Sequence, residues 1–219
     1  MQPEFWHERW RTGQIGFHQP AVEPSLPRYW PELGVPAGRG RVFVPLCGKS
    51  LDLLWLRQQG HFVVGVELSA AALEAFCLEN GVAARRRALG PFDVYEAENM
   101  ELFRGDFFSL TPPLLGEVAA VYDRAALIAW PPGLRAPYAA RIAELTRPGC
   151  RVLLLTLEYP QTQISGPPFS VKSEEIAALY GPRFTFEELA REDILAQEER
   201  LRSRGLTALA QVCYQLVRK

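Results

Sequence analysis

The chain of 219 residues has few histidines and cysteines and no long uninterrupted hydrophobic run. Its three histidines show no metal-ligand spacing, so we expect no metal site. Its four cysteines form no CxxC pair, which favours reduced thiols and a cytoplasmic protein. No apolar run approaches the roughly 20 residues that cross a bilayer. The charged, aromatic start MQPEFWHERW lacks the apolar core of a signal peptide.

Neither sign of charge dominates the sequence. The 24 basic and 25 acidic side chains give a formal net charge of −1. Because no basic surplus is present, a nucleic-acid partner is not expected. The proportions of hydrophobic (48%) and charged (22%) residues are typical of an ordinary globular protein, and the length fits one α/β domain with additions. We therefore expect a single domain with neither a nucleic-acid nor a membrane partner.

The stretch RVFVPLCGKSLDLLWLRQQGHFVVGVELS carries the strongest pattern in the chain. An apolar run at 42–46 is followed by a turn that contains Gly48, a helical segment at 51–59 and a second apolar run at 63–67 that ends in Glu67. This order predicts a β-α-β unit whose second strand closes on an acid. In open α/β sheets such a unit binds an adenosine-type cofactor at the carboxyl ends of the strands.

The turn in this unit does not match the glycine-rich motifs that wrap phosphates. Gly48-Lys49-Ser50 resembles the end of a P-loop, but the position five residues before Gly48, where the motif needs glycine, is Phe43. The motif GxGxxG is also missing, which counts against a nicotinamide-dependent oxidoreductase and leaves it as an alternative. A single glycine suits a turn whose backbone approaches a nucleoside without enclosing a pyrophosphate.

Apolar strands and helices alternate along the rest of the chain, which predicts a mostly parallel sheet covered on both faces. Further strands are expected at 101–104, 118–123 and 151–157, with an extra short strand pair within 85–97 and two extended segments at 184–189 and 206–217. Further helices are expected at 3–11, 25–32, 70–79, 134–146 and 173–180. Ser69 is the predicted N-cap of the helix at 70–79.

Charged residues follow several of the predicted strands and are candidates for a site. Glu67 could hold ribose hydroxyls or could be a solvated strand end. Asp106 could accept a hydrogen bond from an adenine amino group, although the pattern alone favours a turn-forming residue. Asp123 and Arg124 either face the cleft or form a local ion pair. Cys47 has no suitably placed histidine to activate it, so we interpret it as a structural thiol.

The N-terminal segment joins a short helix to a loop rich in glycine and proline. Trp6 and Trp10 share one face of the helix at i, i+4 spacing, and the loop TGQIGFHQPAVEPSLP contains Phe17. These aromatic residues either belong to the core or form a cover that stacks on a flat ligand.

Seven motifs occur together and in order: FWHERW, GFHQP, VFVPLCGKSLDLLWL, GHFVVGVELS, VYDRAALIA, SGPPFSV and EERLRSRGL. On these motifs the sequence resembles the thiopurine S-methyltransferase family, closely its bacterial branch, over essentially the whole chain. The resemblance implies an α/β fold, the Rossmann-like class I methyltransferase fold. It has a mostly parallel seven-stranded sheet, an antiparallel last strand and an N-terminal helical cover. Residues 1–35 would form this cover or lid, and residues 36–219 the catalytic core.

The resemblance also implies S-adenosylmethionine as the cofactor and a role for individual residues. The implied cofactor-binding residues are Trp10, Leu46, Gly48, Glu67, Asp106, Phe107 and Arg124. The implied substrate-binding residues are Phe17, Pro167, Pro168 and Arg200, and the implied catalytic residues are Arg124 and Arg200. Asp106 departs from the mammalian pattern, which has no acid there, but fits the general methyltransferase pattern.

The expected reaction is S-methylation of aromatic and heterocyclic thiols such as thiopurines by direct in-line transfer. Arginine stays protonated, so Arg124 and Arg200 would orient and stabilise a thiolate and would not act as bases. Methylation of selenium or tellurium species is an alternative acceptor chemistry, and a module that binds the cofactor without catalysis is a third possibility. The resemblance implies a monomer acting on a small molecule.

Overall fold

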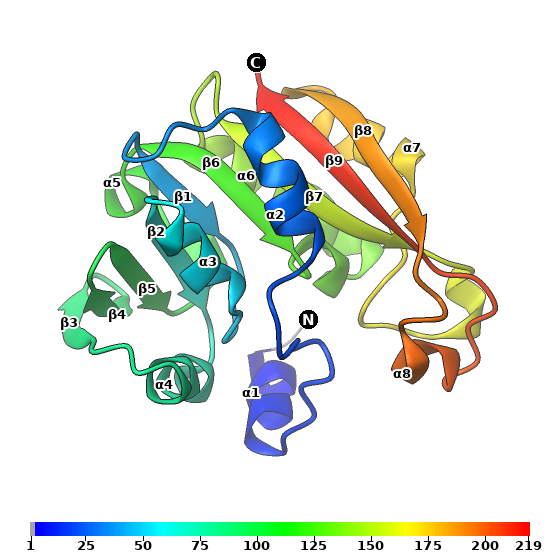
Figure 1. Ribbon diagram of the computed structural model, residues 1–219, viewed down its shortest axis with the longest axis horizontal. Coiled ribbons are helices and arrows are strands. Elements are labelled where there is room, and N and C mark those ends of the chain that lie inside the picture. Colours follow the sequence, from blue (N-terminus) through cyan, green and yellow to red (C-terminus); the bar gives the residue numbers. More distant parts are fainter. Residues whose placement is uncertain (1–2) are drawn as a thin grey trace.

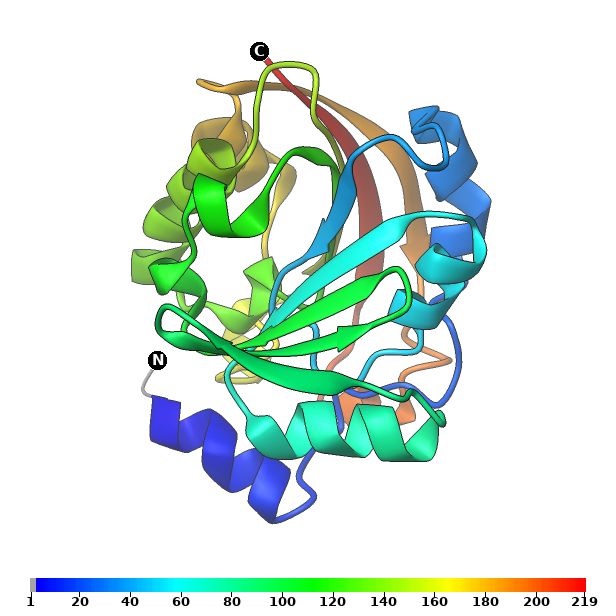
Figure 2. The same cartoon turned by 90° about the vertical axis from the view of Figure 1, so that its left-hand side faces the viewer.

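A nine-stranded β-sheet runs through the molecule, with helices on both of its faces (Figures 1 and 2). This computed structural model describes residues 3–219, so the first two residues of the predicted cover lie outside the described residues. The strand order is β3-β4-β5-β2-β1-β6-β7-β9-β8. The strands are β1 (Arg41–Val44), β2 (Phe62–Glu67), β3 (Arg85–Leu89), β4 (Phe92–Ala97), β5 (Met100–Arg104), β6 (Val118–Arg124), β7 (Arg151–Glu158), β8 (Phe184–Asp193) and β9 (Ala210–Arg218).

The five central strands, β5, β2, β1, β6 and β7, run parallel, as the alternating pattern predicts. Strand β9 lies antiparallel between β7 and β8, which confirms the predicted antiparallel C-terminal pair. The prediction of seven strands was wrong. The short pair expected within 85–97 forms β3 and β4, and β4 pairs with β5, so this pair extends the main sheet at its edge.

The predicted helices are present with small shifts of their ends. The longer ones are α1 (Pro3–Arg11), α3 (Asp52–Gln58), α4 (Ala70–Glu79), α6 (Pro132–Leu145) and α7 (Ser173–Tyr180). Short ones are α2 (Ser25–Tyr29), η1 (Trp30–Leu33), η2 (Phe107–Ser109), α5 (Pro112–Leu115), η3 (Leu127–Ala129), η4 (Gln161–Gln163) and α8 (Glu199–Arg202). Ser69 caps α4 as predicted, because its side chain accepts a hydrogen bond from the Ala72 amide at 3.4 Å.

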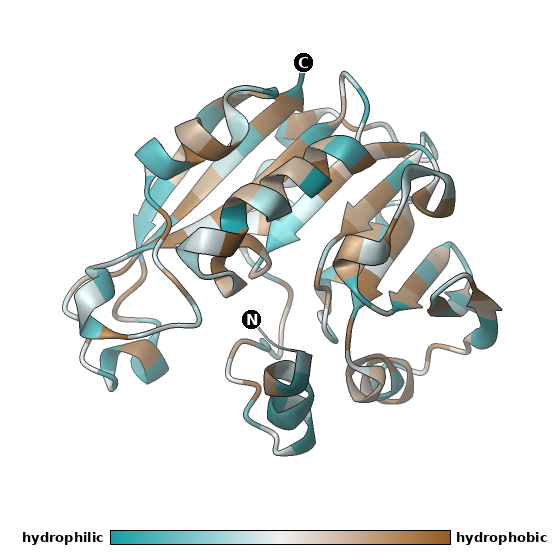
Figure 3. Ribbon diagram, turned by 180° about the vertical axis from the view of Figure 1, so that it is seen from behind, coloured by the Kyte–Doolittle hydropathy of each residue, from teal (hydrophilic) through white to brown (hydrophobic). Residues whose placement is uncertain are grey.

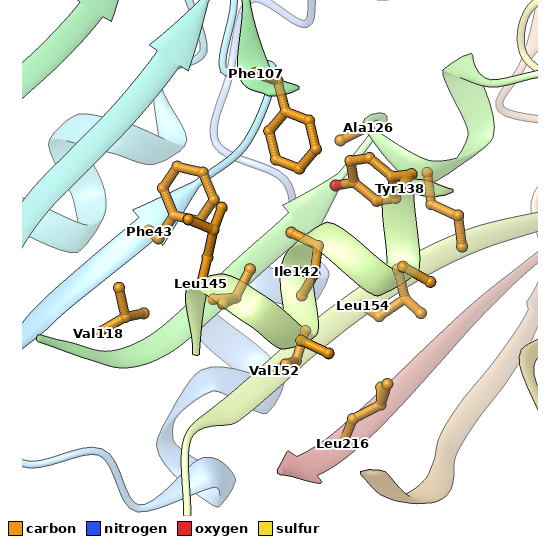
Figure 4. Packing of buried hydrophobic residues seen from close by; sticks show 14 of the residues in the cluster. Phe43, Phe107, Val118, Ala126, Tyr138, Ile142, Leu145, Val152, Leu154 and Leu216 are labelled. Atoms are coloured by element: carbon orange, nitrogen blue, oxygen red, sulfur yellow. The ribbon is translucent and has the colours of Figure 1, made fainter. Parts of the chain in front are cut away.

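The core lies in two layers, one on each face of the sheet. On one face α6 and α7 pack over the central strands, and Figure 4 shows Tyr138 and Ile142 of α6 in one cluster with Phe43 of β1 and Leu154 of β7. On the other face residues from α2, α3 and α4 form the second layer. Apolar residues concentrate on the central strands, whereas α1 is largely hydrophilic and has no buried residue (Figure 3). Helix α1 therefore stands outside the core, beside α4 (Figure 2).

Several strand ends differ from the predictions, and β8 runs on to Asp193 where the sequence predicted an end at 189. Local structure explains two of the other differences. Strand β1 ends at Val44 and not at Leu46, because Leu46 has a left-handed backbone with φ of 47° and belongs to the following turn. Strand β9 begins at Ala210 and not at Leu206. The amide of Thr207 donates to the side chain of Gln163, and Leu206 is buried in a separate small cluster.

Gly65, in the middle of β2, allows close packing between the sheet and the turn after β1. A β-carbon at Gly65 would lie 2.7 Å from Cys47 Sγ and 2.8 Å from Leu102 Cδ2, both on buried side chains. We predict that Gly65→Ala lowers the free energy of unfolding by about 1–3 kcal/mol, because the core is overpacked. Urea denaturation would measure this loss.

Gly133, near the start of α6, provides the matched control. A β-carbon there meets no atom within 4 Å, and the residue is helical, so Gly133→Ala should leave stability unchanged or raise it by up to about 1 kcal/mol. Equal effects of the two substitutions would contradict the packing argument.

Candidate active site

A cavity of about 600 Å³ lies at the carboxyl ends of the parallel strands. This volume is within the range of small-molecule sites. Its walls come from the ends of β1, β2, β5, β6 and β7, from the N-terminal segment, from the loop after β7 and from α8. All eleven residues proposed from the sequence line it: Trp10, Phe17, Leu46, Gly48, Glu67, Asp106, Phe107, Arg124, Pro167, Pro168 and Arg200.

The N-terminal segment forms part of the cavity wall and makes aromatic contacts there. A β-carbon at Gly48 would lie 3.3 Å from Trp10 Cζ2, so the indole rests on the turn after β1. Phe17 packs edge-on against both Trp10 and Trp6, with ring centroids 5.5 and 5.6 Å apart. Because α1 has no buried residue, these side chains line the pocket and are not part of the main core.

Backbone strain gathers at the pocket. Of the three non-glycine residues with positive φ among residues 3–219, Leu46 and Ala125 line the cavity, at the turns after β1 and β6. Gly48 also has a positive φ, of 54°. Such conformations cost free energy and tend to persist where the surrounding structure enforces them, often at functional sites. These residues therefore hold the two turns in conformations that shape the cavity wall.

Glu67 lies at the end of β2 with its side chain turned towards the turn after β1. One carboxylate oxygen accepts a hydrogen bond from the Gly48 amide at 3.0 Å, and the other accepts one from the Ser69 amide at 2.8 Å. Burial raises the pKa of this carboxyl group, and the backbone hydrogen bonds oppose that shift. Each oxygen retains a lone pair, so the carboxylate can still accept hydrogen bonds from a ligand.

Asp106 and Phe107 follow β5 and differ in their surroundings. Asp106 is exposed and its carboxylate accepts a hydrogen bond from the Phe108 amide at 3.0 Å, which caps the short η2 helix. This is the turn-forming role that the pattern alone favoured, although the residue also lines the cavity. Phe107 is buried, and its ring lies in the core against Tyr138, with centroids 4.9 Å apart.

A buried polar cluster beside Arg124 was not expected from the sequence. Arg124 Nε lies 3.8 Å from a carboxylate oxygen of Glu23, and Arg124 Nη1 lies 3.5 Å from the carbonyl oxygen of Phe17. Asp52 accepts hydrogen bonds from the Glu23 amide at 2.8 Å and from the Tyr122 hydroxyl at 3.1 Å. Burial raises the pKa of Asp52, while the charge of Arg124 opposes that shift.

Arg200 reaches the cavity from α8, on the side of the N-terminal loop. Although much of the residue is exposed, its guanidinium lies so close to Gly16 that a β-carbon there would be 2.7 Å from Nε. Partial desolvation, followed by the charge of Arg204, lowers the pKa of Arg200. Pro167 and Pro168, in the loop after β7, complete this part of the wall.

Three of the described residues that line the cavity also carry a buried polar atom without a hydrogen-bond partner. Among residues 3–219, these atoms are Arg9 Nε, Trp130 Nε1 and Thr156 Oγ1. Buried polar groups are normally hydrogen-bonded, so these three atoms are exceptions. These residues were missed by sequence reasoning, since no motif distinguishes them.

Cys47 behaves as the structural thiol proposed from the sequence. It is buried against Gly65, and burial raises its pKa well above the usual value, as does the neighbouring Glu67 to a smaller degree.

Within residues 3–219 no group of three or more His, Cys, Asp or Glu side chains is arranged to hold a metal ion. No helix in that part of the chain is long and apolar enough to cross a membrane.

Solved structures with the same fold include methyltransferases. A 1,6-didemethyltoxoflavin N1-methyltransferase from Burkholderia thailandensis, with S-adenosylhomocysteine bound, superimposes with a TM-score of 0.66 at 18% identity and covers 99% of this chain and 87% of its own. A methyltransferase from Anabaena variabilis gives 0.64 at 13% identity, covering 99% and 95%. The fold of this chain is thus one that these two methyltransferases share.

The sequence comparisons identify one family. The family described as Thiopurine S-methyltransferase (TPMT) matches residues 1–219. Thiopurine S-methyltransferases from Nitrosospira multiformis and Pseudomonas fluorescens SBW25 are each 48% identical over 99% of this chain and cover 98% and 99% of their own lengths. The chain belongs to the thiopurine S-methyltransferase family, and its cofactor is S-adenosylmethionine.

Asp123 lies between pocket-lining neighbours on β6 but does not itself line the cavity, so the idea that it faces the cleft was wrong. Because side chains alternate along a strand, Tyr122 and Arg124 face the cavity and Asp123 points to the other side. There it accepts hydrogen bonds from the Leu127 amide at 3.1 Å and from the Tyr138 hydroxyl at 2.7 Å. Burial raises its pKa from 3.8 to about 6 in spite of them.

This shift predicts a pH dependence of stability. The folded state holds the proton of Asp123 more tightly than the unfolded state. The contribution of this proton to the unfolding free energy is therefore complete below pH 3.8 and is lost as the pH rises through 6. The loss amounts to about 3 kcal/mol. We predict that Asp123→Asn flattens the fall in unfolding free energy between pH 4 and 6.5. Asp193→Asn, on the surface, should leave that fall unchanged. Chemical denaturation at a series of pH values measures both. An unchanged slope in Asp123→Asn would contradict the assignment.

Proposed function

We propose that the protein transfers a methyl group from S-adenosylmethionine to the sulfur of aromatic and heterocyclic thiols, such as thiopurines, by direct in-line displacement. One observation carries the proposal. The eleven residues to which the family resemblance gives roles lie far apart in the sequence, from Trp10 to Arg200, and all line a single cavity. The thiopurine S-methyltransferases at 48% identity over nearly the whole chain support the acceptor class.

The end of the cavity formed by β1, β2 and β5 suits the cofactor. We assign the ribose hydroxyls to Glu67, backbone contacts to Leu46 and Gly48, and packing to Trp10. The adenine would lie near Asp106 and Phe107, with Asp106 contributing its exposed carboxylate and Phe107 its backbone, since the Phe107 ring is in the core.

The other end of the cavity suits a flat, soft nucleophile. Phe17, Pro167 and Pro168 offer apolar surfaces for an aromatic ring, while Arg124 and Arg200 supply positive charge. Such charge favours a thiolate over a thiol, which raises the nucleophilic fraction of the acceptor. Arginine does not deprotonate in proteins, so we assign both residues to orienting and electrostatic roles.

The protein's contribution to the reaction is alignment and exclusion of water. The bound cofactor supplies an activated methyl group on a sulfonium centre. We assign the exclusion of water to the N-terminal segment, whose Trp10 rests on the turn at Gly48. Holding donor and acceptor in line lowers the entropic part of the barrier.

The acceptor range and the cellular setting are also proposals. Selenium and tellurium species are soft nucleophiles like thiolates, so the same site would accept them, and a detoxifying role would follow. The four cysteines are unpaired, which fits a reducing compartment such as the cytoplasm. We further propose that the protein acts as a monomer on a small-molecule acceptor.

We predict that Glu67→Ala weakens binding of S-adenosylhomocysteine at least ~100-fold, because charged hydrogen bonds to the ribose and support of the Gly48 turn are lost together. Isothermal titration calorimetry measures the affinity. Glu74→Ala, which removes an exposed carboxylate from the neighbouring helix α4, should leave it unchanged. If a folded Glu67→Ala protein binds as tightly as the unmodified chain, the ribose role is refuted.

The reaction itself is tested by transfer of a labelled methyl group from S-adenosylmethionine to 6-mercaptopurine, with selenite and tellurite in parallel. Label on the purine sulfur is the expected result. Transfer only to selenium or tellurium would mean that the acceptors are selenium or tellurium species and not thiols. The reaction would still be methyl transfer from S-adenosylmethionine. Cofactor binding without transfer to any acceptor would support a sensor and contradict the proposal.

A further inference from the structure

The positive charge of the Arg124 guanidinium is only partly neutralised by the residues around it. The nearest acid is Glu23, whose Oε2 lies 3.8 Å from Arg124 Nε, close enough for an ion pair but too long for a hydrogen bond. Its contact with the Phe17 carbonyl oxygen is long as well, at 3.5 Å. Arg124 makes no other hydrogen bond within residues 3–219, so its donors remain available to an anion in the cavity.

Glu23 is fixed in place by contacts on its other side. Its Oε1 accepts a hydrogen bond from Gln211 Nε2 at 3.1 Å and a longer one from the Ser25 amide at 3.4 Å. Its own amide donates to Asp52, and the residue is 4% exposed. The carboxylate therefore cannot swing into solvent, and Oε2 stays directed at Arg124.

This corner holds two buried acids and one arginine. Glu23 and Asp52 are both buried carboxylates, and Arg124 is the one basic side chain with an ion-pair contact to either within residues 3–219. An acceptor thiolate bound at Arg124 would therefore share the guanidinium with an acid that is already present. A nearby negative charge disfavours a second one, and the effect is strong where water is excluded.

We infer that Glu23 is a positioning residue, whose buried carboxylate orients the Arg124 guanidinium and offsets part of its charge, so that it competes with the acceptor anion. This inference rests on the proposed function, since it requires the acceptor to lie beside Arg124. Its consequence is that Glu23 limits how far the site ionises a bound thiol. The chain thereby accepts thiols that are already acidic, such as heterocyclic ones, in preference to alkyl thiols.

Other titratable groups surround the pair and are accounted for in the test. His18 in the N-terminal loop, Asp52 of α3, Tyr122 of β6 and Cys213 of β9 lie near enough to Glu23 or Arg124 to interact by charge, and Tyr122 also donates to Asp52. The pH dependence of the reaction rate would combine the ionisations of all these groups. A spectrum of the acceptor itself reports only its own ionisation.

The test is an ultraviolet titration of 6-mercaptopurine bound to the protein with S-adenosylhomocysteine, between pH 5 and 9. Thiolate and neutral forms absorb differently, so the midpoint gives the ionisation of the bound acceptor. We expect Glu23→Gln to move the midpoint down by about 0.5–1 pH unit, because one negative charge beside Arg124 is removed. Gln retains an oxygen that can accept from the Ser25 amide, so the local fold is kept.

Two further variants make the result specific. Glu23→Asp keeps the charge but draws it back by one methylene group, so the midpoint should fall part of the way, and this variant serves if Glu23→Gln does not fold. Glu192→Gln removes an exposed acid that pairs with Arg28 at 2.7 Å, away from the cavity, and should leave the midpoint unchanged.

The outcomes separate this inference from the proposed function. If 6-mercaptopurine binds and the midpoint is unmoved or rises in both Glu23 variants, charge sharing at Arg124 is overturned and the proposed function stands. If the unmodified protein binds S-adenosylhomocysteine but no thiol, the proposed acceptor site fails, and the inference fails with it.

Discussion

The carboxylate of Glu67 joins the two turns on which one end of the cavity is built. It holds the Gly48 amide of the turn after β1 and the Ser69 amide at the start of α4. A buried carboxylate is costly unless its oxygens are hydrogen-bonded, and here two backbone donors stabilise it. Because Gly48 in turn supports Trp10, this one side chain ties the sheet to the N-terminal cover. The geometry of the cavity depends on that connection.

The parallel sheet accounts for the rest of the arrangement. Parallel strands bring all their carboxyl ends to one edge, so residues that follow β1, β2, β5, β6 and β7 meet there although the sequence separates them widely. Strand alternation then selects which of them face the cavity. On β6 it directs Tyr122 and Arg124 inward and buries Asp123 among core residues behind the sheet.

Much of this could be predicted from the sequence, because local patterns determine it. The limits of α4 and α7 were predicted correctly, since apolar spacing and the Ser69 cap define them. The seven-strand count was wrong because whether a short hairpin joins a sheet depends on its edge partner, β5, which no local pattern reveals. The true end of β1 was missed because the left-handed backbone at Leu46 has no sequence signal comparable to glycine.

The polar cluster beside Arg124 shows a deeper limit. Glu23 contacts Asp52 across 29 positions, and Asp52 contacts Tyr122 across 70. Each residue alone is unremarkable: an acid in a proline-containing loop, an acid at a helix start and a tyrosine in a strand. Only the three-dimensional arrangement brings them together. By contrast, strand alternation would have placed Asp123 on the opposite face from Arg124, since the period of two is a property of sequence alone.

The central claim is that one cavity binds the cofactor by its ribose at Glu67 and presents its sulfur to the arginine-lined end. A crystal structure of the protein with S-adenosylhomocysteine tests this most directly. The account predicts ribose hydroxyls within hydrogen-bonding distance of the Glu67 carboxylate and the sulfur atom directed towards Arg124. A ribose bound away from Glu67, or a sulfur atom turned away from Arg124, would contradict it.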